Sequence, residues 1–263
     1  MTTDPSANAF LRPGKLVLLV ALGLFVYAAA LIWQVPAGWL WQQARAAVAL
    51  PPSVQVQQVS GTLWDGAAGL SVAGYPVRID WRLGWPSLSD VSLPADVSVT
   101  TARSGLSGTV RLAWPETLSL NASGSVAVAE FAELIRRSGG AMIEGDVRID
   151  RLALTMADQR LAKADGLATW PGGRVTWPMG NQTGTASFPP MEATLSGTGN
   201  GINLEIAARG AEGPAADATV GANGMMDIRV YKRMVDLAGQ PWPDAAQPGS
   251  VVFRVRQSLG SAL

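Results

Sequence analysis

In VRIDWRL, residues 77–83, apolar and charged side chains alternate without a break, and this segment gives the clearest indication of the fold. In an extended chain, Val77, Ile79, Trp81 and Leu83 point to one side, and the Arg and Asp residues between them point to the other. This period of two is typical of a β-strand with one buried face and one face in water.

The same alternation recurs along the chain, in segments 54–57, 110–114, 147–150, 202–206 and 253–256. Strands of a parallel sheet are usually apolar on both faces, so the alternation favours antiparallel pairing. The 29 Gly and 17 Pro residues supply the turns between such strands. The sequence therefore predicts an all-β fold built as one domain.

Helices are expected to be few and short. Segment 129–138 (AEFAELIRRS) has three large apolar residues on one side and ends before two glycines, which predicts a short amphipathic helix. Segment 225–237 is strand-like at its start and helix-like towards its end. Segment 212–224 is poor in large side chains, and we expect a loop or a weak edge strand there.

Residues 16–33 (LVLLVALGLFVYAAALIW) contain no charged side chain, and a run of this length approaches the roughly 20 residues that cross a ~30 Å hydrocarbon core. Arg12 and Lys15 precede the run and the next positive residue is Arg45, so the positive-inside bias places the N-terminus in the cytoplasm. The chain is therefore expected to divide into a cytoplasmic tail (1–15), a transmembrane helix (16–33), a juxtamembrane helix (34–52) and an exported β-rich domain (53–263).

A cleaved signal peptide is the alternative for this segment. Ala28, Ala29 and Ala30 satisfy the small-x-small pattern that signal peptidase requires. The apolar run continues beyond them through residues 31–33, further than a usual signal core, which favours the uncleaved anchor. In both cases the β-rich domain leaves the cytoplasm.

The composition excludes several classes of function. The chain has no His and no Cys, which removes the commonest metal ligands, thiol nucleophiles and general bases. Lys+Arg (20) equals Asp+Glu (20), so there is no basic surface for nucleic acid. Lysine occurs only at 15, 163 and 232, and none lies in an S-x-x-K setting. We expect no catalytic residue, no metal site and no cofactor.

The phrase GTLWDG, residues 61–66, can be explained by local geometry alone. The glycine at its start permits a turn, the next three residues read as a short strand, and Asp65-Gly66 is a strong turn dipeptide. We expect a hairpin in which Trp64 is buried in the sheet. The residues given this structural role are Gly61, Thr62, Leu63, Trp64 and Gly66.

Half of the ten Trp residues directly precede a proline. Proline cannot donate to a β-ladder, so each Trp-Pro pair is expected to mark the end of a strand. The side chains would then cap the open ends of the sheet core or, alternatively, form an aromatic rim for an apolar or saccharide ligand. These residues are Trp85, Trp114, Trp170, Trp177 and Trp242.

The longer phrase VSGTLWDGAAGLSVAGYPVRIDWRL, residues 59–83, stands a short helix beyond a lone N-terminal anchor. In this setting it resembles protein N of the type II (general) secretion pathway. The closing segment 235–259 resembles the last strand of that family, and ADGLATWPGG, residues 164–173, is the best fragment between them. The resemblance implies a long, curved antiparallel sheet with an apolar inner face in the periplasm. The box is also similar to one in AsmA-like long-sheet envelope proteins.

The resemblance implies a non-enzymatic subunit of the secretion machine in the cell inner membrane. Its partners would be other type II secretion subunits, of the inner-membrane platform or the outer-membrane channel. The alternative is a periplasmic lipid-binding or lipid-transfer module, and a soluble hydrolase comes a distant third. A sheet core filled by its own side chains favours the first, whereas an open groove with room for an acyl chain favours the second.

Overall fold

The computed structural model describes residues 19–24, 26–27, 34–45, 50–51, 53–87, 91–137, 140–158, 160–180, 182–198, 201–242 and 246–258. Within the expected transmembrane helix 16–33, residues 19–24 and 26–27 are helical, and the others lie outside the described residues. No helix formed by the described residues is both long and apolar enough to cross a membrane. The membrane span therefore stays a prediction from the sequence.

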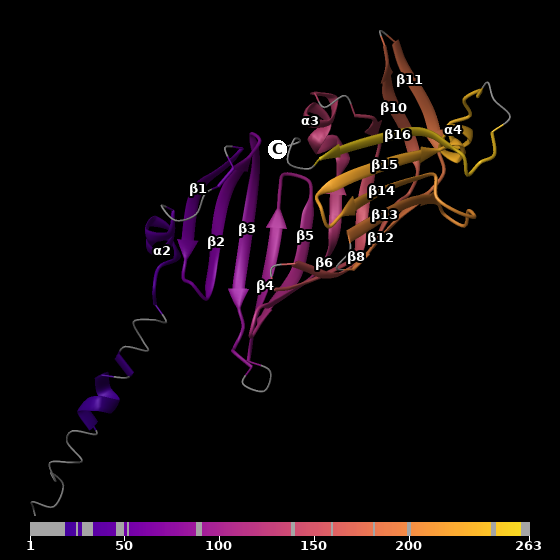
Figure 1. The fold of residues 1–263 in the computed structure, drawn as a ribbon. Helices are drawn as coiled ribbons and strands as arrows, with labels where there is room; N and C mark the ends of the chain where they lie inside the picture. The colour runs from indigo at the N-terminus through magenta and orange to yellow at the C-terminus, as the bar shows by residue number, and fades with distance from the viewer. Residues whose placement is uncertain are drawn as a thin grey trace, which may run out of the picture.

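The described residues form one long, curved sheet of 13 antiparallel strands and a second sheet of three (Figure 1). The strands of the long sheet are, in spatial order, β1 (Val54–Gly61), β2 (Asp65–Val72), β3 (Tyr75–Leu83), β4 (Ser92–Thr100), β5 (Gly105–Ala113), β6 (Thr117–Ala127), β8 (Asp146–Ala157), β9 (Arg160–Trp170), β12 (Met191–Thr198), β13 (Gly201–Ala208), β14 (Ala216–Gly221), β15 (Met225–Tyr231) and β16 (Val251–Ser258). The all-β antiparallel prediction is confirmed.

Two excursions interrupt the up-and-down order. Between β6 and β8 the chain forms the 3₁₀ helix η1 (Val128–Phe131), the helix α3 (Ala132–Arg137) and the short strand β7 (Met142–Ile143). Between β9 and β12 it forms the hairpin of β10 (Gly173–Met179) and β11 (Gln182–Phe188). The second sheet has the order β11-β10-β7. Because β6 pairs directly with β8, the predicted helix near 129–138 exists but does not divide the long sheet.

The register explains why one face is apolar across the whole sheet. Ile79 of β3 lies opposite Ala68 of β2 and Val99 of β4, so apolar residues face apolar neighbours. The intervening residues form the polar face, where Arg78 and Asp80 make an ion pair at 2.7 Å. The alternation seen in the sequence is thus continued from strand to strand.

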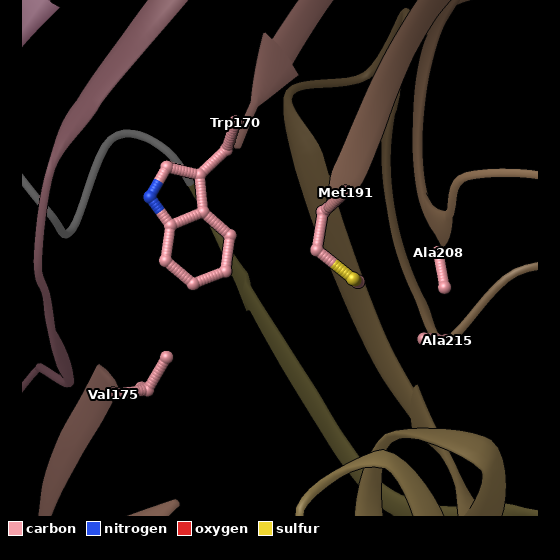
Figure 2. Packing of buried hydrophobic residues seen from close by; sticks show 5 residues of the cluster. All are labelled: Trp170, Val175, Met191, Ala208 and Ala215. Atoms are coloured by element: carbon pink, nitrogen blue, oxygen red, sulfur yellow. The ribbon is translucent and has the colours of Figure 1, made fainter. Parts of the chain in front are cut away.

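The fully packed core is small and lies where the second sheet covers the first. It consists of Trp170, Val175, Met191, Ala208 and Ala215. Figure 2 shows the Trp170 indole beside Met191 and Val175. Among the described residues, no large side chain is completely buried, and most apolar side chains of the long sheet are only half-buried. The described residues therefore leave much of the apolar face uncovered.

The segment predicted to be a loop or weak edge, 212–224, is the main correction to the expected strands. It contains β14, an interior strand paired with β13 on one side and β15 on the other. Its small residues fit between these neighbours, and Asp217, 5% exposed, is held by hydrogen bonds from Arg229 (2.8 Å) and the Tyr231 hydroxyl. Tertiary pairing overrides the weak local preference here.

The prediction that each Trp-Pro pair ends a strand is wrong at one position. Trp177-Pro178 does not end a strand but lies inside β10. Proline is accepted there because β7 pairs with β10 only at Val175 and Thr176, which leaves Pro178 without a ladder partner on that side. Within the predicted juxtamembrane helix 34–52, the described residues form the helix α2 (Ala37–Ala44), and residues 46–49 and 52 lie outside the described residues. At the C-terminal end, 225–237 divides as predicted into β15 and the helix α4 (Lys232–Leu237).

Candidate functional site

The turn between β1 and β2 is made by Thr62, Leu63 and Trp64, whereas Asp65 and Gly66 already belong to β2. The sequence predicted a short strand at residues 62–64 and a turn at Asp65-Gly66, so it exchanged the strand and the turn. The Thr62 hydroxyl decides the geometry, because it accepts a hydrogen bond from the backbone N–H of Asp65 at 3.1 Å. The backbone N–H of Thr62 in turn donates to the Asp65 carbonyl at 2.8 Å. Such local side-chain bonds compete with a regular ladder and close the turn.

Two glycines of this box are required by close approach. Gly61 has φ +83°, and a Cβ there would lie 2.5 Å from the Asp65 carbonyl oxygen. At Gly66 a Cβ would lie 2.4 Å from Cζ2 of Trp81. The Trp81 indole therefore packs directly over the backbone of β2, and its Nε1 donates to the Leu63 carbonyl at 3.1 Å. Trp81 fixes the turn from the neighbouring strand.

The turn also holds the segment that precedes the sheet. The backbone N–H of Leu63 donates to the Val35 carbonyl at 3.2 Å, and Thr62 forms an isolated β-bridge with Pro36. Immediately afterwards α2 packs on β1, with Ala37 buried. We call these contacts the entry clamp. No local pattern in the sequence predicts the clamp, because it joins residues far apart along the chain.

The side chains at the tip of this turn are less buried than predicted. Leu63 is 39% exposed and Trp64 is half-buried. Trp64 is therefore not fully enclosed in a core, and the Trp81 indole packs against Gly66 of the box.

An apolar hollow lies between the second sheet, the end of the long sheet and α4. It has a volume of about 860 Å³ and is bordered by Trp170, Trp177, Phe188 and Met234, among others. Polar side chains are few in its lining, which includes Thr169, Glu192 and Gln240. We call it the apolar cavity. Its size is within the usual range for ligand pockets.

The structure separates the five tryptophans predicted as an aromatic rim into two groups. Trp170, Trp177 and Trp242 line the apolar cavity. Trp114 borders a smaller hollow of about 570 Å³ at the other end of the strands, next to the turn that carries Trp85. Trp85 and Trp114 are each 78% exposed, so they do not cap a core. No single rim contains all five residues.

The strand β16 borders the apolar cavity and ends the long sheet (Figure 1). Within the described part of the chain, no strand pairs with its outer side. Phe253, on this strand, is 58% exposed and lines the cavity. On the opposite face, Arg254 and Arg256 both donate to Asp227. Sequence reasoning predicted this strand but not that its edge adjoins an open apolar cavity.

The charged residues are engaged in separate pairs. Asp65 pairs with Arg82 at 3.0 Å, and Lys232 pairs with Asp236 at 2.7 Å. Asp150 accepts a hydrogen bond from Thr169 at 2.9 Å. Among the described residues, no group of three acidic side chains is arranged to hold a metal ion. The polar face contains a hollow of about 930 Å³, but the ion pairs that border it are largely exposed to water.

A comparison with known protein families identifies the family of the chain, which the geometry alone does not. The family model of protein N of the type II secretion system matches residues 52–249. The chain belongs to this family. The match includes the GTLWDG turn and extends from the end of the juxtamembrane segment almost to β16. No curated protein and no solved structure gave a match.

Membership gives this chain a role in type II secretion, together with other components of that system. The family is in general a non-catalytic component associated with the cell envelope. The resemblance that carried the sequence interpretation is confirmed.

Proposed function

We propose that this chain is a non-enzymatic subunit of the type II secretion system that assists assembly or stabilisation through protein contacts. In this proposal residues 16–33 anchor it in the inner membrane, the N-terminus is cytoplasmic, and the domain 53–263 is periplasmic. The uncharged N-terminal segment, with Arg12 and Lys15 in front of it, supports this orientation.

The observation that carries the proposal is the free edge of β16 beside the apolar cavity. An unpaired edge offers backbone N–H and C=O groups to an extended segment of another protein. Alternate side chains of such a segment would face the cavity, next to Phe253 and Val252. Backbone pairing would then provide affinity and the cavity would provide specificity.

The test is photocrosslinking in cells that carry the secretion system. A photoreactive amino acid at Phe253 is expected to crosslink to one or more secretion subunits. The matched control is Thr194, an exposed residue on the polar face of the interior strand β12. Equal crosslinking from both positions, or none from Phe253 in secreting cells, would contradict docking at this edge.

A lipid-binding or lipid-transfer module is the second candidate, and the open apolar cavity is the observation that favours it. Its volume of about 860 Å³ has room for an acyl chain. Lipid retained by the purified protein and displaced by Ala193→Phe, which narrows the cavity, would favour this function. Ala153→Phe, on the polar face of β8, is the matched control because Ala153 pairs there with Asp165.

A further inference from the structure

The entry clamp fixes one margin of the sheet next to the uncharged segment. Val35 follows the run 16–33 by two residues, and its carbonyl accepts the 3.2 Å hydrogen bond from Leu63. The turn that contains Leu63 lies at the margin that also carries the turns after β3 and β5. We call this the lower margin, as drawn in Figure 1, where the helical residues 19–24 lie beyond it.

Large apolar side chains gather at the lower margin and are mostly exposed. Trp85 and Trp114 are each 78% exposed, Val91 is 64% exposed and Leu112 is 55% exposed. The turns after β2 and β4, at the opposite margin, contain only small or polar residues in 73–74 and 101–104. The turns at the two margins of this half of the sheet thus differ in polarity.

Pairing holds these side chains together as one surface. The backbone N–H of Trp114 donates to the Val91 carbonyl at 3.1 Å, which ties the two turns to each other. Leu112 lies opposite Leu118, and Leu118 lies opposite Met156 on the next strand. We call this surface the tryptophan rim; it comprises Trp85, Val91, Leu112, Trp114, Leu118 and Met156.

We propose that the tryptophan rim docks on the lipid surface of the membrane that residues 16–33 enter, so that the sheet stands on the bilayer at its lower margin. This inference rests on the proposed anchoring. Tryptophan side chains are enriched at the membrane–water interface, where one end of the indole is apolar and the other is wet. Exposed apolar patches on a protein surface mark such contacts.

The position of the rim favours lipid over protein as the occupant. The entry clamp binds the exit of the uncharged segment to the same margin, which keeps that margin within reach of the bilayer. The rim therefore requires no additional partner to be covered. The contact holds the sheet upright and directs the apolar cavity and the edge of β16 away from the membrane plane.

The chain has no Cys, so one introduced cysteine can carry a single fluorescent label on the full-length protein. The protein would be placed in phosphatidylcholine nanodiscs whose acyl chains carry nitroxide. A label at Val91→Cys is expected to be quenched several-fold more by the lipid nitroxide than a label at Ala102→Cys, in the opposite turn. Iodide in solution should instead quench the label at Ala102→Cys more than the label at Val91→Cys.

Equal quenching of the two labels by nitroxide would overturn the proposal. A chain that fails to enter nanodiscs would overturn the anchor and the rim together, whereas entry without quenching at residue 91 would overturn the rim alone. Shielding of residue 91 only when secretion subunits are added would identify a protein as the occupant and would also overturn it.

A pair of variants tests the role of the indoles. Trp85→Ala combined with Trp114→Ala should reduce the lipid quenching at Val91→Cys several-fold without unfolding the sheet, because both side chains are mostly in water. Trp242→Ala, in the other tryptophan group, is the matched control and should leave it unchanged. Unchanged quenching in the double variant would contradict docking through the indoles.

Discussion

At Gly66 the strand β2 passes under the indole of Trp81, and a Cβ would lie 2.4 Å from Cζ2. Gly66→Ala is therefore expected to lower the free energy of unfolding by about 1 to 3 kcal/mol, because Trp81 must shift from the turn it holds. Chemical unfolding followed by circular dichroism measures the change. Gly69→Ala on the same strand is the control, since no atom lies within 4 Å of its added Cβ. Equal losses for the two variants would contradict this role of Gly66.

Asp227 provides a prediction about pH. Its hydrogen bond from Arg254 lowers the pKa of the carboxyl from 3.8 to about 2, and Arg256 adds to the effect. A lowered carboxyl pKa gives stability that is present above the unfolded-state pKa and is lost as the pH falls through the folded one. The difference in Tm between the parent and Asp227→Asn should thus be constant near neutral pH and shrink from about pH 4 to about pH 2. A Tm difference that persists unchanged at pH 2 would show that it does not come from the ionised Asp227 carboxylate.

Among single elements, β14 contains a buried carboxylate, Asp217, that accepts hydrogen bonds from two side chains of β15. Asp217→Ala leaves Arg229 and the Tyr231 hydroxyl without their shared acceptor, and should cost about 2 to 4 kcal/mol of unfolding free energy. Asp96→Ala, which removes an exposed carboxylate with one hydrogen bond from Thr109, should cost only about 0.5 kcal/mol. Unfolding in urea measures both variants. Comparable losses of unfolding free energy would show that the Asp217 carboxylate does not stabilise β14 more than an exposed carboxylate does.

The strands with clear alternation were predictable, and those decided by their neighbours were not. Residues 77–83 have the apolar period of two, and β3 contains them all. Residues 216–221 (ADATVG) also alternate, but their apolar side chains are small and the signal is weak, and pairing with β13 and β15 makes them an interior strand. In the GTLWDG box the composition signalled a turn, but the Thr62 hydroxyl bond, which places it, is not visible in the pattern.

The sequence predicted which residue types form the candidate functional surfaces, but not which of these residues lie together. Trp-Pro pairs indicated indoles that cap the core or form one aromatic rim, yet the fold places Trp85 and Trp114 at one end and Trp170, Trp177 and Trp242 at the other. The entry clamp joins Val35 to Leu63 across the whole of α2 and β1. Contacts of this kind follow from tertiary structure, and one sequence contains no local signal for them.

In the whole molecule, the long sheet has one apolar face, and the described residues cover only a small part of it. The packed cluster around Trp170 occupies only the region under the second sheet. A half-buried apolar face is costly in water, so burial against a partner would be favoured by about 25 cal/mol per Å² covered, before the costs of association. An open sheet with a free edge therefore fits a subunit that works through contacts.

The same view predicts that single polar residues are dispensable for secretion. Asp146→Ala, Asp150→Ala and Lys163→Ala should each leave secretion within a few-fold of normal, because exposed substitutions shift stability by only about 0.5 kcal/mol. Secretion of a substrate protein into the medium is the readout, with protein level as the control. A folded Lys163→Ala variant that abolishes secretion would reopen an enzymatic function.

If this chain acts by contact with other secretion subunits, those subunits should remain bound to it during purification. The tagged full-length protein would be recovered from cell envelopes, and the proteins that accompany it would be quantified. We predict that known subunits of the type II secretion system are enriched with the parent protein, and that this enrichment falls in a Phe253→Asp variant that still folds. Recovery of lipid without any secretion subunit would contradict the claim.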